Sequence, residues 1–271
     1  MDLALWQIIV LAVVQGIAEF LPISSSGHLV VVASWFASQA NGESVANLDV
    51  ADLNIVLHAG TLLSILVFYW RRVVWLLGED RRVIGLLIVG TIPAVIVGLT
   101  IKQYFEHWLS NPILAGAMLF VTGGVLLWSG RVEHNKEATY RQMSFVHALM
   151  IGLSQALAIL PGISRSGLTI CTGLGLGLRR ESAATFSFLL AIPAIAGASV
   201  LEMKDLATET TMSTPIGHLL AGAVVAFVVG LMSLWWLIRW LERGHLSWFA
   251  YWCFVVGTVV LVWQLWPAGG G

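Results

Sequence analysis

Residues 15–29 read QGIAEFLPISSSGHL, and residues 155–169 read QALAILPGISRSGLT. The two segments lie 140 residues apart and share six of fifteen positions without a gap. Each contains proline, glycine and serines, which interrupt helices, and each lies in an otherwise apolar part of the chain. The match indicates an internal repeat centred on two broken hydrophobic regions.

The rest of the chain has the composition of a membrane protein. Its 271 residues are 58% hydrophobic and 11% charged, and the mean hydropathy is +0.86. In a soluble protein about a quarter of all residues are charged. Apolar stretches recur from residue 3 to residue 266 without a long polar interval, so we expect a single integral membrane domain over 1–271. The net charge of −1 argues against nucleic acid as a partner.

A helix that spans a membrane needs about 20 apolar residues. Six segments meet this requirement: 53–70, 83–101, 112–130, 183–201, 217–238 and 247–266. The regions 3–38 and 143–178, which contain the repeated motif, are too long for one helix and too interrupted for two. Non-helical backbone is tolerated at membrane depth only where protein or a wet cavity surrounds it. We therefore expect each region to form a re-entrant helical hairpin.

The positions of the basic residues favour this arrangement, because Lys and Arg concentrate in short cytoplasmic loops. With six crossings, eleven of the fourteen fall on one side: Arg71, Arg72, Arg81, Arg82, Arg131, Lys136, Arg141, Arg179, Arg180, Arg239 and Arg243. Lys102 and Lys204 fall on the other side, and Arg165 falls inside the second hairpin. Both termini are then expected outside, and the two hairpins enter from opposite sides.

The predicted fold is an all-α polytopic membrane protein with an inverted-topology repeat. Repeat 1 covers about 3–130 and repeat 2 about 143–266. Three crossings separate the two copies of the motif, and an odd number of crossings inverts the second copy. The two broken elements can then meet near the bilayer midplane.

Polar residues that the rest of the chain lacks gather at this meeting point. Glu19 and Arg165 are costly in hydrocarbon, and ionisable residues at such positions mark functional sites. Around them lie Gln15, Ser24, Ser25, Ser26, Gly27 and His28 in the first hairpin, and Gln155, Ser164, Ser166 and Thr169 in the second. Hydroxyls, free backbone N–H groups, Arg and His together favour a receptor for an oxyanion, above all phosphate.

These motifs resemble those of the undecaprenyl-diphosphate phosphatases of the bacitracin-resistance type. That family has a Glu-or-Gln, three residues, Glu motif that runs into Phe-Leu-Pro-x-Ser-Ser-x-Gly-His, and a second motif Pro-Gly-x-Ser-Arg-Ser-x-x-Thr. Here they stand at 15–19, 20–28 and 161–169. Gln15 stands where the family also has Glu, and an amide at this position argues against a role in proton transfer. Ser26 stands where the family has Thr.

The resemblance implies hydrolysis of undecaprenyl diphosphate to undecaprenyl phosphate and inorganic phosphate, which recycles the lipid carrier for peptidoglycan and confers bacitracin resistance. It also implies a bacterial cytoplasmic (inner) membrane location, contact with membrane lipids, and a site that opens to the periplasmic or outer face. A homodimer stays open as the assembly. The family is metal-stimulated, so a divalent cation, Mg²⁺ or Ca²⁺, is the expected cofactor, with Glu19 as its candidate ligand.

The resemblance and the chemistry of the side chains together assign roles. Ser25 is the first choice as nucleophile, His28 acts as base or protonates the leaving oxygen, and Arg165 neutralises phosphate charge. Glu19 orients His28 or Ser25. The candidate phosphate-binding residues are Gln15, Ser24, Ser26, Gly27, Ser164, Ser166 and Thr169. Direct attack by water, activated by His28 or Glu19, is an alternative that the sequence leaves open.

Two further alternatives are also open. An inverted repeat around midplane charges is the plan of many secondary transporters, so a transporter or flippase of a polyprenyl phosphate or small anion is the competing function. A transporter needs an anion receptor but no nucleophile and base.

His58 lies within an apolar region, and the sequence favours neither a packing role nor a place beside the site.

Overall fold

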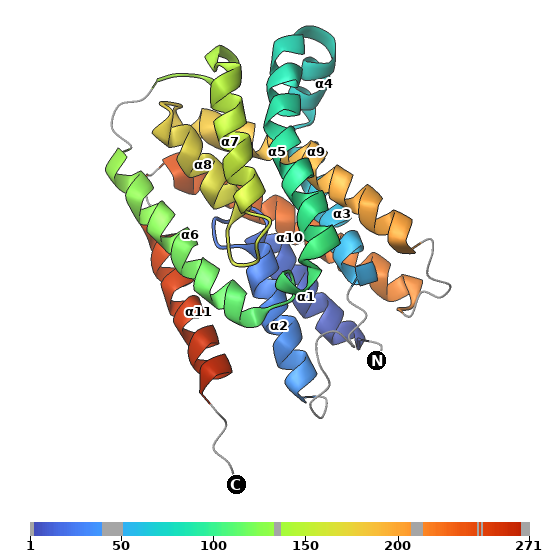
Figure 1. The fold of residues 1–271 in the computed structure, drawn as a ribbon. Coiled ribbons are helices and arrows are strands. Elements are labelled where there is room, and N and C mark those ends of the chain that lie inside the picture. The colour runs from blue at the N-terminus through green and yellow to red at the C-terminus, as the bar shows by residue number, and fades with distance from the viewer. Residues whose placement is uncertain are drawn as a thin grey trace.

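The computed structural model describes residues 3–39, 51–132, 137–206, 214–242, 244 and 246–266. These residues are almost entirely helical (Figure 1). The α-helices are α1 (Leu5–Ala18), α2 (Ser25–Gln39), α3 (Ala51–Phe68), α4 (Trp70–Glu79), α5 (Arg81–Tyr104), α6 (Pro112–Val132), α7 (Phe145–Leu157), α8 (Arg165–Gly175), α9 (Arg180–Leu206), α10 (Ile216–Glu242) and α11 (Ser247–Leu265). The described part of the chain contains no β-strand, which confirms the all-α prediction.

Five helices, α5, α6, α9, α10 and α11, are long and apolar enough to cross a membrane. They coincide with five of the six predicted spans. Many large apolar side chains on them face outward, among them Ile96, Val224 and Val259, which are about 60% exposed (60%, 60% and 62%). An apolar outer surface of this extent suits contact with lipid rather than water, which confirms a multi-pass membrane protein.

The sixth predicted span, 53–70, corresponds to α3 and ends at a sharp bend. The helix α3 ends at Phe68, and α4 begins at Trp70 with a bend of 77° between them. The bend falls where the apolar run meets Arg71 and Arg72, whose charges are costly in hydrocarbon. The pair α3–α4 is therefore either one broken span or a re-entrant segment, and the described helices give five spans, or six if this pair counts as one, as predicted.

Both interrupted regions form two helices joined by a turn. In region 3–38, α1 and α2 flank residues 19–24, and in region 143–178, α7 and α8 flank residues 158–164. Proline ends the helical path in each turn, because its ring removes a backbone donor and clashes with the preceding turn. In Figure 1, α7 and α8 descend from the top while α1 and α2 rise from the bottom, and their turns approach in the middle.

A serine at the corresponding position caps the N-terminus of the second helix in each pair. Ser24 Oγ accepts a hydrogen bond from the Gly27 N–H at 3.2 Å, and Ser164 Oγ accepts one from the Gly167 N–H at 3.1 Å. A serine that caps a helix in this way satisfies one of the free N–H groups of the first turn. The repeated sequence motif therefore builds the same serine cap twice, although the backbone of the capping residue differs, with a φ of +73° at Ser24 and −76° at Ser164.

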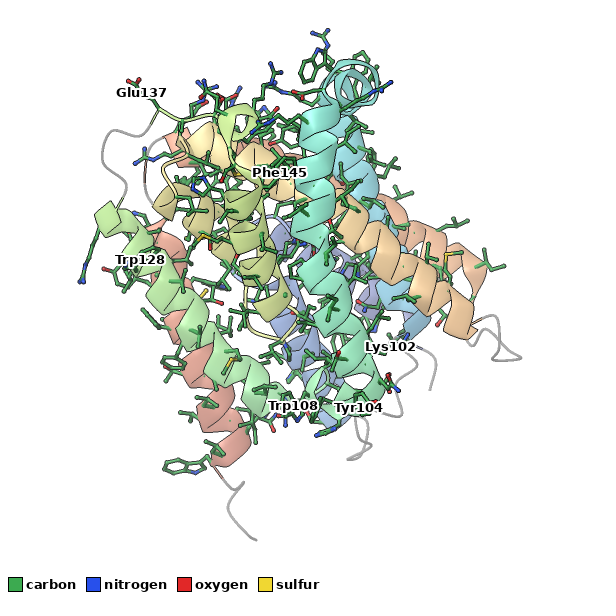
Figure 2. The ribbon with its side chains drawn as sticks, turned by 45° about the horizontal axis from the view of Figure 1, so that its top comes forward. Lys102, Tyr104, Trp108, Trp128, Glu137 and Phe145 are labelled. Carbon is green, nitrogen blue, oxygen red and sulfur yellow. The ribbon has the colours of Figure 1, made fainter. Side chains whose placement is uncertain are left out.

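Basic side chains gather at one end of the helices. Arg82 donates to the carbonyls of Arg141 and Met143, and Arg179 pairs with Glu181. Figure 2 places Glu137 and Phe145 at this end, and Lys102, Tyr104 and Trp108 at the opposite one. Lys136 and Arg243 lie outside the described residues, as do Asp2, Glu43, Asp49 and Glu209 among the acidic residues.

Glycine lets the two turns come into contact. A Cβ on Gly27 would lie 2.9 Å from the Cα of Gly162, and a Cβ on Gly162 would collide with the carbonyl oxygen of Ala115. Gly162 also has a φ of +91°, which disfavours any residue with a side chain. The close approach of the two turns therefore depends on Gly27, and the packing of the second turn against α6 depends on Gly162.

A comparison of Gly162→Ala with Gly177→Ala separates the effect of a steric collision from that of backbone strain, because Gly177 also has a positive φ, +97°. An alanine at either position costs about 1–2 kcal/mol from its conformation. A Cβ on Gly177 would meet nothing within 4 Å, so only Gly162→Ala adds a collision. We expect Gly162→Ala to lower the midpoint of thermal unfolding in detergent well below that of Gly177→Ala. Equal unfolding midpoints would contradict the close contact between Gly162 and Ala115 on α6.

Candidate active site

A buried ion pair joins the two turns. Glu19 follows the last residue of α1, and Arg165 is the first residue of α8. Arg165 Nη2 lies 2.6 Å from Glu19 Oε1, and the two side chains are only 16% and 6% exposed. A buried charge of this kind is stable only when it is paired, so the predicted interior charges satisfy each other across 146 residues of sequence.

The second oxygen of Glu19 is bound by the first hairpin. Ser25 Oγ donates to Oε2 at 2.7 Å, and Gln15 Nε2 donates to the same oxygen at 3.1 Å. Gln15 reaches it because residues four apart share one face of a helix. The carboxylate therefore fixes the Ser25 hydroxyl in one orientation.

Ser24 shapes the first turn. It has a φ of +73°, which is rare for a residue with a side chain and is seen where the surrounding structure enforces it. Its Oγ accepts from the N–H of Gly162 at 3.1 Å as well as from Gly27, and it lies 3.4 Å from Ser26 Oγ. Its carbonyl oxygen lies 2.8 Å from His28 Nδ1. Ser24 thus ties the first turn to the second.

His28 is held by a residue that the sequence did not single out. Trp252 on α11 donates its indole N–H to His28 Nε2 at 3.0 Å, and the two rings are stacked within 6° of parallel. Since the Ser24 carbonyl only accepts, these contacts place the imidazole hydrogen on Nδ1. In the sequence, Trp252 is one of thirteen tryptophans, and nothing local distinguishes it from those at the membrane interface.

A threonine on α6 fixes the second turn. Thr122 Oγ1 donates to the carbonyl oxygen of Gly162 at 2.7 Å and accepts from the N–H of Ser164 at 3.0 Å. Its side chain is fully buried. Thr122 lies in an unbroken apolar helix, so the sequence carries no signal of this role.

The remaining predicted hydroxyls of the second hairpin bond to protein. Ser166 Oγ donates to the carbonyl oxygen of Leu21 at 3.2 Å, which joins the turns again. Thr169 Oγ1 donates to the carbonyl oxygen of Arg165 at 2.7 Å and contacts Ser187 on α9. Both side chains are 1% exposed. These contacts position Arg165 and the turn.

The structure brings His58 to the site. Its Nε2 lies 3.9 Å from Glu19 Oε2, and its Nδ1 lies 2.8 Å from the carbonyl oxygen of Asn54. The sequence left packing and site roles equally open for this histidine, because its distance from residue 19 depends on how α3 packs against α1. The geometry assigns it to the surroundings of Glu19.

Several buried polar atoms at the repeated motifs lack a partner among the described residues. Arg165 Nη1 and Gln15 Oε1 are two of them, and both side-chain atoms of Gln155 are others. Leaving such a group unsatisfied is costly. A guanidinium N–H that is free while its neighbour holds Glu19 suits an incoming phosphate oxygen.

The side chains offer little for a protein-held cation. The described residues contain no group of three or more His, Cys, Asp and Glu that could hold a metal ion. Glu19 alone contributes a carboxylate, and its oxygens already accept from Arg165 and Ser25. The donor set therefore does not fit a metal centre built from protein ligands.

A cavity of about 470 Å³ lies away from these residues, between α4, α5 and α9. Apart from Thr91 it is lined by apolar side chains, such as Leu76, Ile88 and Leu189. No residue of the Glu19–Arg165 site lines it. Its chemistry suits hydrocarbon rather than a phosphate group.

Comparison with known proteins gives one consistent result. Residues 8–259 match the family model of the bacitracin resistance protein BacA. An undecaprenyl-diphosphatase of Rhodopirellula baltica is 54% identical over 96% of this chain and 98% of its own. Undecaprenyl-diphosphatases of Desulfatibacillum aliphaticivorans and Methanosphaera stadtmanae are 39% and 38% identical over 94% of this chain and 97% and 96% of theirs.

Arg165→Met tests the buried pair. It leaves the Glu19 carboxylate buried without its partner, which costs about 3–5 kcal/mol. Arg179→Met is the matched control, since Arg179 and Glu181 pair at 3.0 Å with side chains 49% and 50% exposed, where a pair contributes about 0–1 kcal/mol. We expect thermal unfolding to show a large loss for Arg165→Met, partly recovered by adding Glu19→Gln, and little change for Arg179→Met. Similar losses in both would contradict a stabilising buried pair.

Proposed function

Since this chain belongs to the BacA family of bacitracin resistance proteins, we infer that it hydrolyses undecaprenyl diphosphate to undecaprenyl phosphate and inorganic phosphate. The chain covers nearly the full length of relatives that carry the name undecaprenyl-diphosphatase. The product is the lipid carrier of cell-wall synthesis, so the activity recycles that carrier and confers bacitracin resistance. The multi-pass membrane fold suits a substrate with a long hydrocarbon tail.

We propose Ser25 as the nucleophile and Glu19 as its base, because the Ser25 hydroxyl donates to the carboxylate at 2.7 Å. Ser25 Oγ attacks the terminal phosphorus and its proton passes to Glu19. The bond from that phosphorus to the bridging oxygen breaks, and undecaprenyl phosphate leaves with the electron pair. Water then attacks the phosphoserine, Glu19 returns the proton to Ser25 Oγ, and inorganic phosphate leaves.

Arg165 is the proposed phosphate ligand. Its Nη2 holds Glu19, and its buried Nη1 has no partner among the described residues. A guanidinium binds phosphate oxygens with directed hydrogen bonds and neutralises charge as it builds in the transition state. Ser26 is the other proposed direct contact of the phosphate, because its side chain is only partly buried.

The other candidate residues support the site through its shape. Gln15 holds the Glu19 carboxylate, and Thr169 bonds to the Arg165 carbonyl within α8. The remaining members join or cap the turns: Ser24, Gly27, Ser164 and Ser166. For His28 we propose proton donation to the leaving oxygen. This step requires Trp252 to release Nε2 and Nε2 to take up a proton from water first, since His28 carries its hydrogen on Nδ1 and the indole N–H now occupies Nε2.

We further propose that the chain is one membrane domain built as an inverted repeat with two re-entrant hairpins. The support is the matching pair of turns, which share a serine cap and approach from opposite ends (Figure 1). In addition, α1 packs on α10, and α7 packs on α5, the helix in the corresponding place of the other repeat.

The proposed location is the cytoplasmic (inner) membrane, with the basic end of the helices in the cytoplasm and the site open to the outer face. The support is the excess of Arg at one end of the molecule. A homodimer is the proposed assembly. A divalent cation, Mg²⁺ or Ca²⁺, is proposed to arrive on the diphosphate oxygens of the substrate, the way in which Mg²⁺ commonly binds.

A transporter or flippase has weaker support. Moving an anion across the membrane requires a receptor such as Arg165 but no serine hydroxyl held by a carboxylate. The Ser25–Glu19 contact is therefore the observation that favours hydrolysis.

The activity is tested by phosphate release from undecaprenyl or farnesyl diphosphate by the purified protein. We expect Ser25→Ala to lower kcat by about a hundredfold or more, and a phosphorylated Ser25 peptide to appear in rapidly quenched wild-type reactions. Ser38→Ala is the control, because Ser38 lies on the same helix and its hydroxyl donates to the Trp35 carbonyl. An inactive wild-type protein would contradict the proposed hydrolysis. A fully active Ser25→Ala would contradict only the assignment of Ser25 as the nucleophile.

The orientation is tested with an impermeant maleimide on whole cells. Tyr104 and Arg131 are exposed and lie at the C-terminal ends of α5 and α6, and these two helix ends are at opposite ends of the molecule (Figure 1). Cys171 and Cys253 are buried and give little background. We expect Tyr104→Cys to be labelled in intact cells and Arg131→Cys only after permeabilisation, because the basic end faces the cytoplasm. The reverse pattern would contradict the proposed orientation.

A further inference from the structure

His58 has one ring nitrogen engaged and one open. Nδ1 lies 2.8 Å from the carbonyl oxygen of Asn54, which can only accept, so Nδ1 carries the hydrogen. Nε2 faces Glu19 Oε2 at 3.9 Å, which is beyond hydrogen-bond distance, and the side chain is 26% exposed. Nε2 therefore remains available to a ligand beside the carboxylate.

The position of His58 is fixed by close packing on α10. A Cβ on Gly60, half a turn from His58, would lie 2.5 Å from the carbonyl oxygen of Ala223. A Cβ on Gly16 in α1 would lie 2.9 Å from Val229 Cβ of the same helix. Both α1 and α3 thus touch α10 at glycines, and this shared support sets the distance between Glu19 and His58.

The charges of the neighbouring residues indicate what His58 can add to the site. Arg165 and Glu19 neutralise each other, so on their own they provide no net positive charge for a diphosphate. With Nδ1 engaged, Nε2 is the nitrogen that faces a ligand beside Glu19, and an imidazolium would present its second N–H there. With that N–H the two cations, His58 and Arg165, would outnumber the one carboxylate.

We propose that His58 is a second phosphate-binding residue, which with Arg165 holds the phosphoryl group on either side of Glu19. Arg165 contacts Oε1 and presents Nη1, which has no partner in the described part of the chain, while His58 faces Oε2 and presents Nε2. If one phosphate oxygen binds each of these two nitrogens, the phosphorus lies near Ser25 Oγ, which itself donates to Glu19 Oε2. This proposal rests on the hydrolytic activity inferred above.

The test compares His58→Leu, which removes the donor and the charge, with His58→Gln, which keeps a donor without the charge. With farnesyl diphosphate as substrate, we expect His58→Leu to lower kcat/KM by about tenfold or more, the effect of losing a hydrogen bond to a charged group. The inhibition constant of inorganic phosphate should rise with it. His58→Gln should fall between His58→Leu and the wild type in both measurements.

His147→Leu is the matched control, because His147 is also partly buried but lies at the start of α7, where its backbone N–H bonds to Ser144. It should match the wild type. If His58→Leu does not elute as a monodisperse protein, His58→Asn replaces it, since an Asn side chain is too short to reach the ligand.

Two results would overturn the proposal. One is wild-type kcat/KM in a folded His58→Leu. The other is a lower kcat with an unchanged inhibition constant for phosphate, which would assign His58 to proton transfer instead. In either case phosphate release by the wild type, measured in the same preparations, shows that the inferred activity stands and that only the role of His58 is wrong.

Discussion

The contact between Glu19 and Arg165 is the constraint on which the site depends. Neither charge is stable alone in an apolar interior, and each stands at a break between two helices, so burying either requires both breaks to meet. The surrounding features satisfy that requirement. Glycines at 27 and 162 allow the backbones to touch, Ser24 and Thr122 bond across or within the turns, and the pair then holds the hydroxyl of Ser25 through the second carboxylate oxygen.

Much of this could be predicted from the sequence, because hydropathy and helix interruption are local properties. Five spanning helices, both broken regions and the serine caps follow from windows of about 20 residues or fewer. Glu19 and Arg165 stood out because charge is so scarce inside the predicted hairpins. The sequence left open whether the two charges pair with each other or face water, because that depends on how closely the two turns approach.

The features that the sequence did not reveal depend on which helix faces meet. Trp252 reaches His28 from 224 residues away, and Thr122 reaches Gly162 from another helix; neither residue type is unusual in an apolar helix. His58 became part of the site only through the packing of α1 and α3 on α10. The bend after Phe68 lies at the end of the predicted span 53–70, where Arg71 and Arg72 follow, but nothing in the sequence indicated that a further helix, α4, continues at an angle of 77°.

Gly162 occupies the place in the second motif that Pro22 holds in the first. Proline is restricted to a φ near −65° and cannot adopt the +91° found at Gly162. The two copies are therefore not interchangeable, and two identical first halves, assembled face to face, would lack both this turn and Arg165. If one gene segment was duplicated to give this chain, the ancestor could not have formed the present contact, and divergence of the copies was needed to complete it.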